Sequence, residues 1–95
     1  MRITFHAAAD REAEEVADYY DRQLPGLGAE FYRELGTILY LLSRNPWMGV
    51  AYFGPYRRVL MQRFPFSVYY EVAGDLIRIM AVAHQHRMPG YWTKR

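Results

Sequence analysis

The chain contains no cysteine, a single lysine and no long apolar run. Without thiols it has neither disulfides nor thiolate metal sites, which is typical of a protein of the reducing cytosol. The opening residues lack the apolar segment of a secretion signal, and no stretch has membrane-spanning length. We therefore expect a cytoplasmic protein with no membrane partner. Its 95 residues predict one domain, residues 1–95, with a single hydrophobic core.

Arginine supplies all but one of the basic residues, and charge is segregated along the chain. Residues 1–44 hold five arginines against eight acids, a net charge of −3. Residues 45–95 hold seven bases against two acids, a net charge of +5. Such segregation creates a local positive field that steers anionic partners. The same pattern is also compatible with solubility alone.

Hydrophobic periodicity predicts a short strand and two helices. Residues 2–6 alternate between polar and apolar side chains, which indicates a strand. Apolar residues then recur at helical spacing over 8–24 and 31–42, with a break at 25–28 that contains one proline and two glycines. The second helix must end near Asn45, because a proline follows it. So short a break predicts an antiparallel helical hairpin.

The rest of the chain predicts an antiparallel meander. Residues 47–55 contain two glycines and a proline, and we interpret them as a loop. Three strands are expected, at residues 56–63, 66–72 and 76–83. Pro65 interrupts the first pair, and residues 73–75 turn the second pair as a hairpin. The predicted fold is α+β in the order βααβββ, a two-helix hairpin packed on a mostly antiparallel sheet.

Cationic and aromatic residues alternate along this predicted meander. Arginine pairs bidentately with phosphate, and an aromatic ring stacks on any base. The same surface suits an acidic segment of a protein partner. The candidates for binding a target or a partner are Arg57, Arg58, Tyr69 and Trp92. Because Tyr69 and Tyr70 must point to opposite faces, at most one of them is available for stacking, and Trp92 alternatively folds back to seal the sheet.

Metal-free RNA cleavage is the sharpest chemical hypothesis for the C-terminal cluster. It needs a base for the 2′-hydroxyl, cations for the phosphate and an acid for the leaving oxygen. His84 and His86 are candidates for base and acid near neutral pH, and Arg63 and Arg87 for holding the phosphate. In a continuing strand the two histidines share one face. The plainer interpretation, which we favour, is that one histidine caps the strand and the other is merely exposed.

The sequence indicates no cofactor and no metal. His84 and His86 are two residues apart, but no carboxylate or cysteine lies close in sequence to complete a coordination sphere. His6 stands at the other end of the chain. We therefore expect any activity to rest on side chains alone.

Several short motifs occur in a characteristic order. They are Ala17-Asp18-Tyr19-Tyr20, Leu24-Pro25-Gly26-Leu27-Gly28, Asn45-Pro46, Tyr56-Arg57-Arg58-Val59-Leu60, Arg63-Phe64-Pro65-Phe66, Val68-Tyr69-Tyr70, and Ala83-His84-Gln85-His86-Arg87 followed by Pro89 and Tyr91-Trp92. Their order and spacing resemble the RelE/ParE superfamily of bacterial toxins from type II toxin–antitoxin systems. The resemblance covers almost the whole chain and is closest to the plasmid-stabilisation, ParE-like branch.

The resemblance implies a growth-inhibiting toxin that a cognate antitoxin protein neutralises in a hetero-oligomer. ParE-like members poison DNA gyrase, whereas RelE-like members cut mRNA in the ribosome. The nuclease branch uses cations on the strands, an arginine after the last strand and a C-terminal aromatic. The resemblance therefore implies catalytic roles for Arg63, Arg87 and Tyr91 (or Trp92) if the chain is a nuclease.

One departure from the nuclease pattern counts against cleavage. Ser67 stands where the nucleases usually place a middle-strand arginine. Together with Phe64-Pro65-Phe66 and the ending Pro89-Gly90-Tyr91-Trp92, it favours a ParE-like toxin that targets DNA gyrase, which would not be an enzyme, whereas a RelE-like toxin would be an mRNA endoribonuclease. The alternatives are a ribosome-dependent mRNA endonuclease and an inactive relic that only binds its antitoxin.

Overall fold

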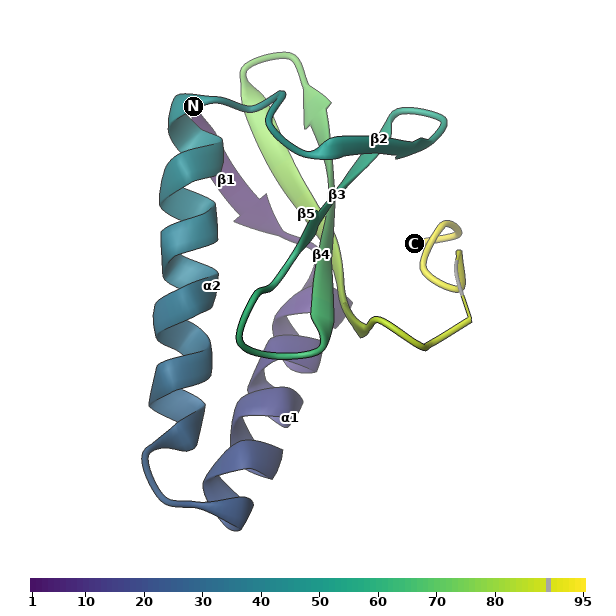
Figure 1. Ribbon diagram of the computed structural model, residues 1–95. Coiled ribbons are helices and arrows are strands. Elements are labelled where there is room, and N and C mark those ends of the chain that lie inside the picture. The colour runs from purple at the N-terminus through teal and green to yellow at the C-terminus, as the bar shows by residue number, and fades with distance from the viewer. Residues whose placement is uncertain (89) are drawn as a thin grey trace.

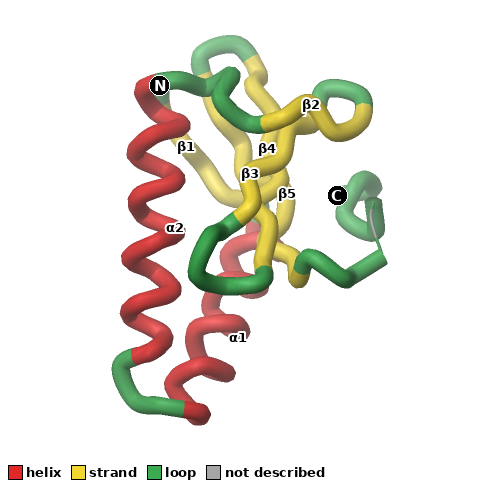
Figure 2. Tube along the Cα trace, viewed as in Figure 1, coloured by secondary structure: helices red, strands yellow, loops and turns green. Residues whose placement is uncertain are grey.

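The computed structural model describes residues 1–88 and 90–95 (Figure 1). Strand β1 (Arg2–Phe5) leads into helix α1 (Ala7–Gln23), and helix α2 (Leu27–Arg44) follows after a short turn. Figure 2 shows the two helices as a hairpin whose turn lies at the end far from the sheet. The strand, both helices and their break are therefore as predicted. Neither helix among the described residues has the length and apolarity needed to span a bilayer.

Local contacts explain where the helices begin. The Nδ1 atom of His6 accepts a hydrogen bond from the Ala8 N–H at 3.0 Å and so caps α1. In the turn, the Asp21 carboxylate accepts from the N–H groups of Gly26 and Gly28 at 3.1 and 2.9 Å. A side chain on Gly28 would lie 2.6 Å from the Ala17 carbonyl oxygen. Glycine at this position therefore allows the two helices to approach closely.

The sheet has five strands in the order β1-β5-β4-β3-β2. The last four strands are β2 (Val50–Phe53), β3 (Tyr56–Leu60), β4 (Phe66–Ala73) and β5 (Leu76–His84). These four form an antiparallel meander, whereas β1 runs parallel to β5. A parallel pair needs a long connection, and here it contains both helices and the strands β2, β3 and β4. The α+β class and the mostly antiparallel sheet are thus confirmed.

Two strand boundaries differ from the prediction. The interpretation of residues 47–55 as a loop is wrong, because Val50–Phe53 pair with β3 as an edge strand. Their glycines flank the strand, and Gly54 has a φ of 54°, which suits the turn into β3. Strand β3 ends at Leu60, because the N–H groups of Gln62 and Arg63 bind the Glu34 carboxylate of α2 instead of β4.

Apolar side chains cover both faces of the sheet. The larger cluster lies between the sheet and the helices and contains Ala9, Ala13, Ala17, Phe31, Leu35, Ile38, Leu42, Met61, Phe64, Val68, Tyr70, Ile77, Ile79 and Val82. The smaller cluster, on the opposite face, contains Tyr69, Met80, Ala81, Ala83 and Trp92. Figure 1 shows the C-terminal tail on the side of the sheet away from α2. This tail, residues 90–95, contributes Trp92 to the smaller cluster.

Tyr69 and Tyr70 lie on opposite faces, as predicted, but both are buried. Their exposed fractions are 6% and 0%. A shift of register occurs between them, because Tyr69 pairs with Ala81 and Tyr70 with Ile79. The bulge places Met80 and Ala81 in the same cluster. Neither tyrosine therefore offers a ring for stacking.

Candidate functional site

Glu12 of α1 fastens the C-terminal tail to the body of the protein. Arg95 Nη1 donates to Glu12 Oε1 at 2.9 Å, and Nη2 donates to Oε2 at 2.8 Å. The Tyr91 hydroxyl donates to Oε2, and the Val82 N–H donates to Oε1 at 3.1 Å. Burial acts to raise the pKa of Glu12, but these hydrogen bonds outweigh it and hold that pKa below its ordinary value. The carboxylate therefore stays charged and paired.

Tyr91 lies between two guanidinium groups. The Cζ atom of Arg87 is 3.9 Å from the centre of the ring, and that of Arg95 is 5.2 Å from it. Burial and the hydrogen bond to Glu12 raise the pKa of Tyr91 well above its ordinary value. The phenol therefore stays protonated as a donor to Glu12. In this structure Tyr91 holds the tail in place.

Trp92 is fully buried in a cage of three tyrosines. Its ring centre lies 4.8 Å from those of Tyr56 and Tyr69 and 6.2 Å from that of Tyr52. The prediction that Tyr69 and Trp92 present a binding surface does not match their burial. The alternative prediction, that Trp92 folds back to seal the sheet, is the observed arrangement. Aromatic pairs at these distances stabilise the fold beyond their buried area.

The histidines end the last strand. Strand β5 stops at His84, so the condition for a shared strand face with His86 is not met, although the centres of the two rings lie 5.4 Å apart. The Nδ1 atom of His84 accepts the His86 N–H at 3.1 Å, and its ring lies against Phe66, with the ring centres 5.2 Å apart. The side chain of His86 is exposed. One histidine caps the strand and the other is exposed, as the plainer interpretation predicts.

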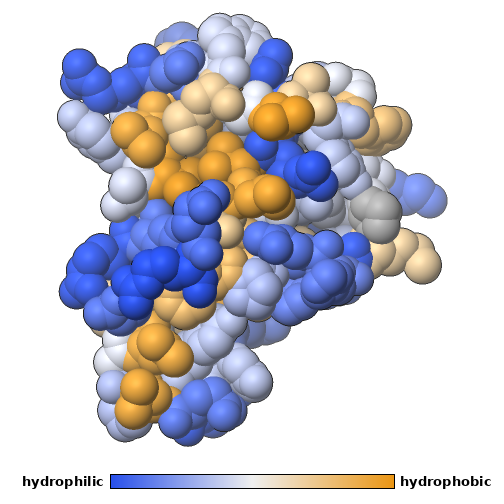
Figure 3. All heavy atoms as spheres, viewed as in Figure 1, coloured by the Kyte–Doolittle hydropathy of each residue, from blue (hydrophilic) through white to orange (hydrophobic). Residues whose placement is uncertain are grey.

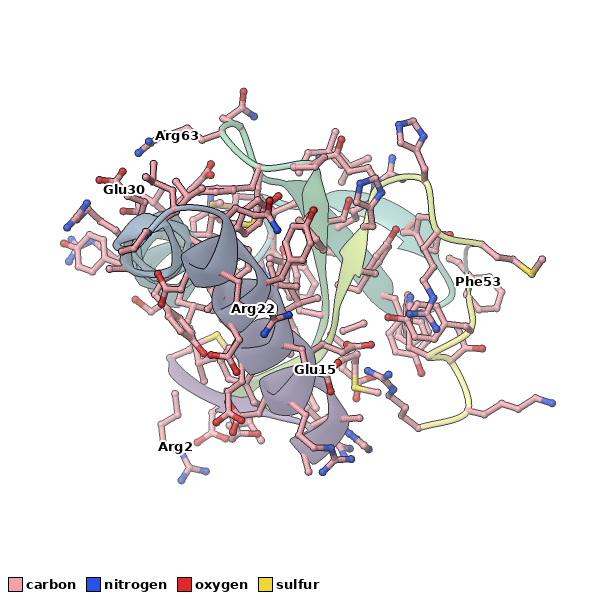
Figure 4. All side chains as sticks on the ribbon, turned by 90° about the horizontal axis from the view of Figure 1, so that it is seen from below. Arg2, Glu15, Arg22, Glu30, Phe53 and Arg63 are labelled. Carbon is pink, nitrogen blue, oxygen red and sulfur yellow. The ribbon has the colours of Figure 1, made fainter. Side chains whose placement is uncertain are left out.

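The structure attaches Arg63 and Arg87 to different elements. Arg63 Nη1 lies 2.6 Å from Glu30 Oε2 of α2, and Figure 4 shows the two side chains next to each other. The hydrogen bond and the charge of Arg63 hold the pKa of Glu30 below its ordinary value. Arg87 instead stacks on Tyr91 of the tail. The two candidate phosphate-holding cations therefore have separate partners in this structure.

A groove of about 530 Å³ opens between α1 and the ends of β4 and β5. Its lining includes Glu12 and Glu15 of α1 together with His84 and Arg87. The carboxylate of Glu15 at this wall disfavours a phosphodiester through charge repulsion, whereas that of Glu12 is paired with Arg95. Among the described residues, no three histidine or acidic side chains are placed to hold a metal ion.

Arg57 and Arg58 lie at the other end of the sheet, on β3. Arg57 Nη1 donates to the carbonyl oxygens of Gly49 and Trp47, at 2.7 and 3.3 Å, and its Cζ lies 5.0 Å from the centre of the Trp47 ring. The Cζ atom of Arg58 lies 5.2 Å from the centre of the Tyr52 ring. Both arginines remain partly exposed. They are therefore available to a partner at this end.

Sequence reasoning missed two residues that organise these surfaces. Glu12 lies beside the apolar stripe of Ala9 and Ala13 on α1, and an acid in that position is a weak sign of a buried ion pair. Trp47 was placed in a loop with no assigned role. A tryptophan between Pro46 and Gly49, outside any periodic apolar pattern, is the only sign of it in the sequence.

Comparisons with known proteins agree with this fold. A family model described as "ParE toxin of type II toxin-antitoxin system, parDE" matches residues 3–89. No curated protein matches the chain. The chain is similar to a solved structure titled "Chromosomal ParDE TA system from P. aeruginosa", with a TM-score of 0.77 and 18% identity over 88% of this chain and 95% of that one. At that identity the likeness shows the fold. Because the family model spans nearly the whole sequence, the chain belongs to the ParE toxin family of type II toxin–antitoxin systems.

Proposed function

We propose that this toxin arrests bacterial growth by acting on DNA gyrase and that a cognate antitoxin neutralises it. The observation that supports this choice of target is that three of the five candidate nuclease residues already have partners within the fold. Tyr91 is bonded to Glu12, Arg63 is paired with Glu30, and the Nδ1 atom of His84 is bonded to backbone. Catalytic groups for RNA cleavage need free positions on a substrate. A toxin that acts by binding its target has no such need.

The middle strand supports the same choice. Ser67 is 1% exposed, and its side chain lies on the face that also carries Tyr69 and Ala83. It provides no charge for a phosphate. The groups on this face are apolar and aromatic, and the tail covers them. A phosphodiester at this position would lose its hydration without gaining a cation.

A ribosome-dependent mRNA endonuclease is the second candidate. Its support is the neighbouring pair His86 and Arg87, which are both exposed after the end of β5. A histidine beside an arginine offers a proton acceptor next to a phosphate ligand. Ribosome binding would have to supply the remaining groups.

Induction of the toxin in cells without its antitoxin separates the two functions. The gyrase function predicts DNA damage and filamentous cells while translation continues at first. Purified toxin is then expected to inhibit supercoiling by purified gyrase. The nuclease function predicts arrest of protein synthesis within minutes and mRNA cuts phased to ribosomal A-site codons. Codon-phased cuts that disappear in Arg87→Ala would overturn the gyrase proposal.

The antitoxin is tested separately, with the product of the adjacent gene. We expect the two proteins to copurify, because the C-terminal half of the toxin carries an excess of positive charge. Coexpression should restore growth. A toxin that arrests growth but shows no affinity for that product would refute the assignment of this partner.

A further inference from the structure

Exposed apolar side chains gather where α2 leads into β2. Four of them are large, namely Trp47, Met48, Val50 and Leu60, with exposed fractions of 59%, 36%, 67% and 46%. Figure 3 shows apolar side chains on the face between α2 and the strands β2 and β3. A groove of about 330 Å³ in this area is lined by Met48, Val50 and Leu60, and Trp47 lies next to Met48 in the chain without lining it. Contiguous apolar surface of this kind marks interaction sites.

The loop that carries Trp47 is held rigidly. The buried Tyr70 hydroxyl accepts from the Gly49 N–H at 2.9 Å and donates to the Pro46 carbonyl oxygen at 2.8 Å. Any side chain on Gly49 would lie 2.5 Å from that hydroxyl. From the other side, Arg57 binds the carbonyl oxygens of Trp47 and Gly49. An exposed tryptophan on a preorganised loop costs little entropy to bind and is a frequent interface hot spot.

Strand β2 offers backbone groups beside this tryptophan. It is the last strand of the sheet, so only its inner edge is paired, with β3. Its sequence, Val-Ala-Tyr-Phe, contains none of the charges or prolines that usually block edge pairing. Extended peptides add to such edges through main-chain hydrogen bonds, with alternate side chains in pockets.

The charge of the groove indicates which kind of peptide segment would bind there. The residues that line the groove include Arg58 and no acid. Arg57 points to the opposite face of the strand, where its guanidinium lies against Trp47. A second copy that docked through the same surface would place one Arg58 against another. A segment with acidic and apolar residues in alternation would place its acids toward Arg58 on one face and its apolar side chains toward Trp47 on the other.

We propose that Trp47, the groove and the free edge of β2 form the docking site for an extended acidic and apolar segment of the cognate antitoxin. The segment adds to the sheet as a sixth strand and places an apolar side chain against Trp47. This inference rests on the proposed function, because it takes the antitoxin as the partner. Its tests therefore measure binding separately from toxicity.

The decisive measurement is calorimetric titration of full-length toxin variants with the purified product of the adjacent gene. We expect Trp47→Ala to weaken binding about 30-fold, as truncation of a hot spot does. The matched control is Leu24→Ala, because Leu24 is 60% exposed and follows the end of α1, in the turn of the helical hairpin. That control should change affinity less than about threefold, as scattered surface residues do. Equal affinities for the wild type and Trp47→Ala would overturn the inference.

A second variant and a second readout cover the case in which Trp47→Ala fails to fold. Val50→Arg adds a charge to the exposed edge and should weaken binding at least about tenfold. Hydrogen exchange at residues 50–53 should slow when the adjacent gene product binds, and unchanged exchange there would reject the added strand. In cells, both variants should still arrest growth while the antitoxin no longer rescues it. Failure of the wild-type toxin to arrest growth would instead count against the proposed function.

Discussion

The Tyr91 hydroxyl donates a hydrogen bond to the carboxylate of Glu12, which joins residues 79 positions apart in the sequence. Arg95 binds the same carboxylate with two nitrogens. The guanidinium of Arg95 also donates to the Met80 carbonyl oxygen at 2.9 Å, so the end of the tail is tied to β5 as well. We call Glu12, Tyr91 and Arg95 the clasp. It holds the tail, and with it Trp92, against the face of the sheet that the helices do not cover. The clasp and Trp92 therefore act as one structural unit.

Removal of the acid from the clasp should destabilise the toxin. The side chains of Glu12 and Arg95 are only 16% and 17% exposed. Loss of one member of a buried ion pair costs about 3–5 kcal/mol, so we expect Glu12→Ala to lower the free energy of unfolding by about 3 kcal/mol. Urea denaturation measures this free energy. Glu14→Ala, at an exposed position of the same helix, should cost no more than about 0.5 kcal/mol. Equal losses in the two variants would show that the clasp contributes little.

The clasp should also make stability depend on pH at the acid side. Because the pKa of Glu12 is lower in the folded state than in the unfolded chain, the unfolded state binds more protons as the pH falls. The contribution of Glu12 is present above the ordinary glutamate value of 4.5 and is lost as the pH falls through the folded pKa. Melting temperatures of the wild type and Glu12→Gln should therefore differ by a constant amount near neutral pH and converge below that value. A difference that grows in acid would contradict this assignment.

Ser67 should be dispensable for stability. Its Oγ atom is buried and has no hydrogen-bond partner among the described residues. A buried hydroxyl without a partner costs free energy, so Ser67→Ala should leave stability unchanged or raise it by about 1 kcal/mol. Chemical denaturation gives the value. A loss of more than about 1 kcal/mol would mean that the hydroxyl makes a contact that stabilises the fold.

Toxicity should depend on Arg87 more than on Arg22. Arg87 lies exposed after β5 with its guanidinium over Tyr91, whereas Arg22 lies exposed on α1 near the hairpin turn. We expect Arg87→Ala to reduce growth arrest roughly tenfold, which corresponds to about 1.4 kcal/mol of binding, and Arg22→Ala to have little effect. Growth curves at matched expression measure this, and thermal melts check that both variants fold. Equal toxicity of the two variants would argue against a target surface at the C-terminal cluster.

Local patterns in the sequence correctly predicted most of the helices, strands and turns. Periodicity placed both helices and the two longest strands, and the proline and glycines at residues 25–28 placed the hairpin turn. These features depend on residues within a few positions of one another. Strand β2 was missed because its four residues have no periodicity of their own and become a strand only through pairing with β3. Whether so short a segment at the edge of a sheet forms a strand depends on the strand that it pairs with.

The sequence by itself determined the α+β class, the helical hairpin, the resemblance to the family and the basic character of the C-terminal half. Only the tertiary structure decided which of those basic and aromatic residues are free. Arg63 is paired with Glu30, 33 positions away, and Trp92 is enclosed by tyrosines from β2, β3 and β4. Trp47, which looks like an ordinary loop residue in the sequence, is instead held exposed by Tyr70 and Arg57. The physical reason is that burial and ion pairing are settled between distant segments, whereas sequence patterns report only on neighbours along the chain.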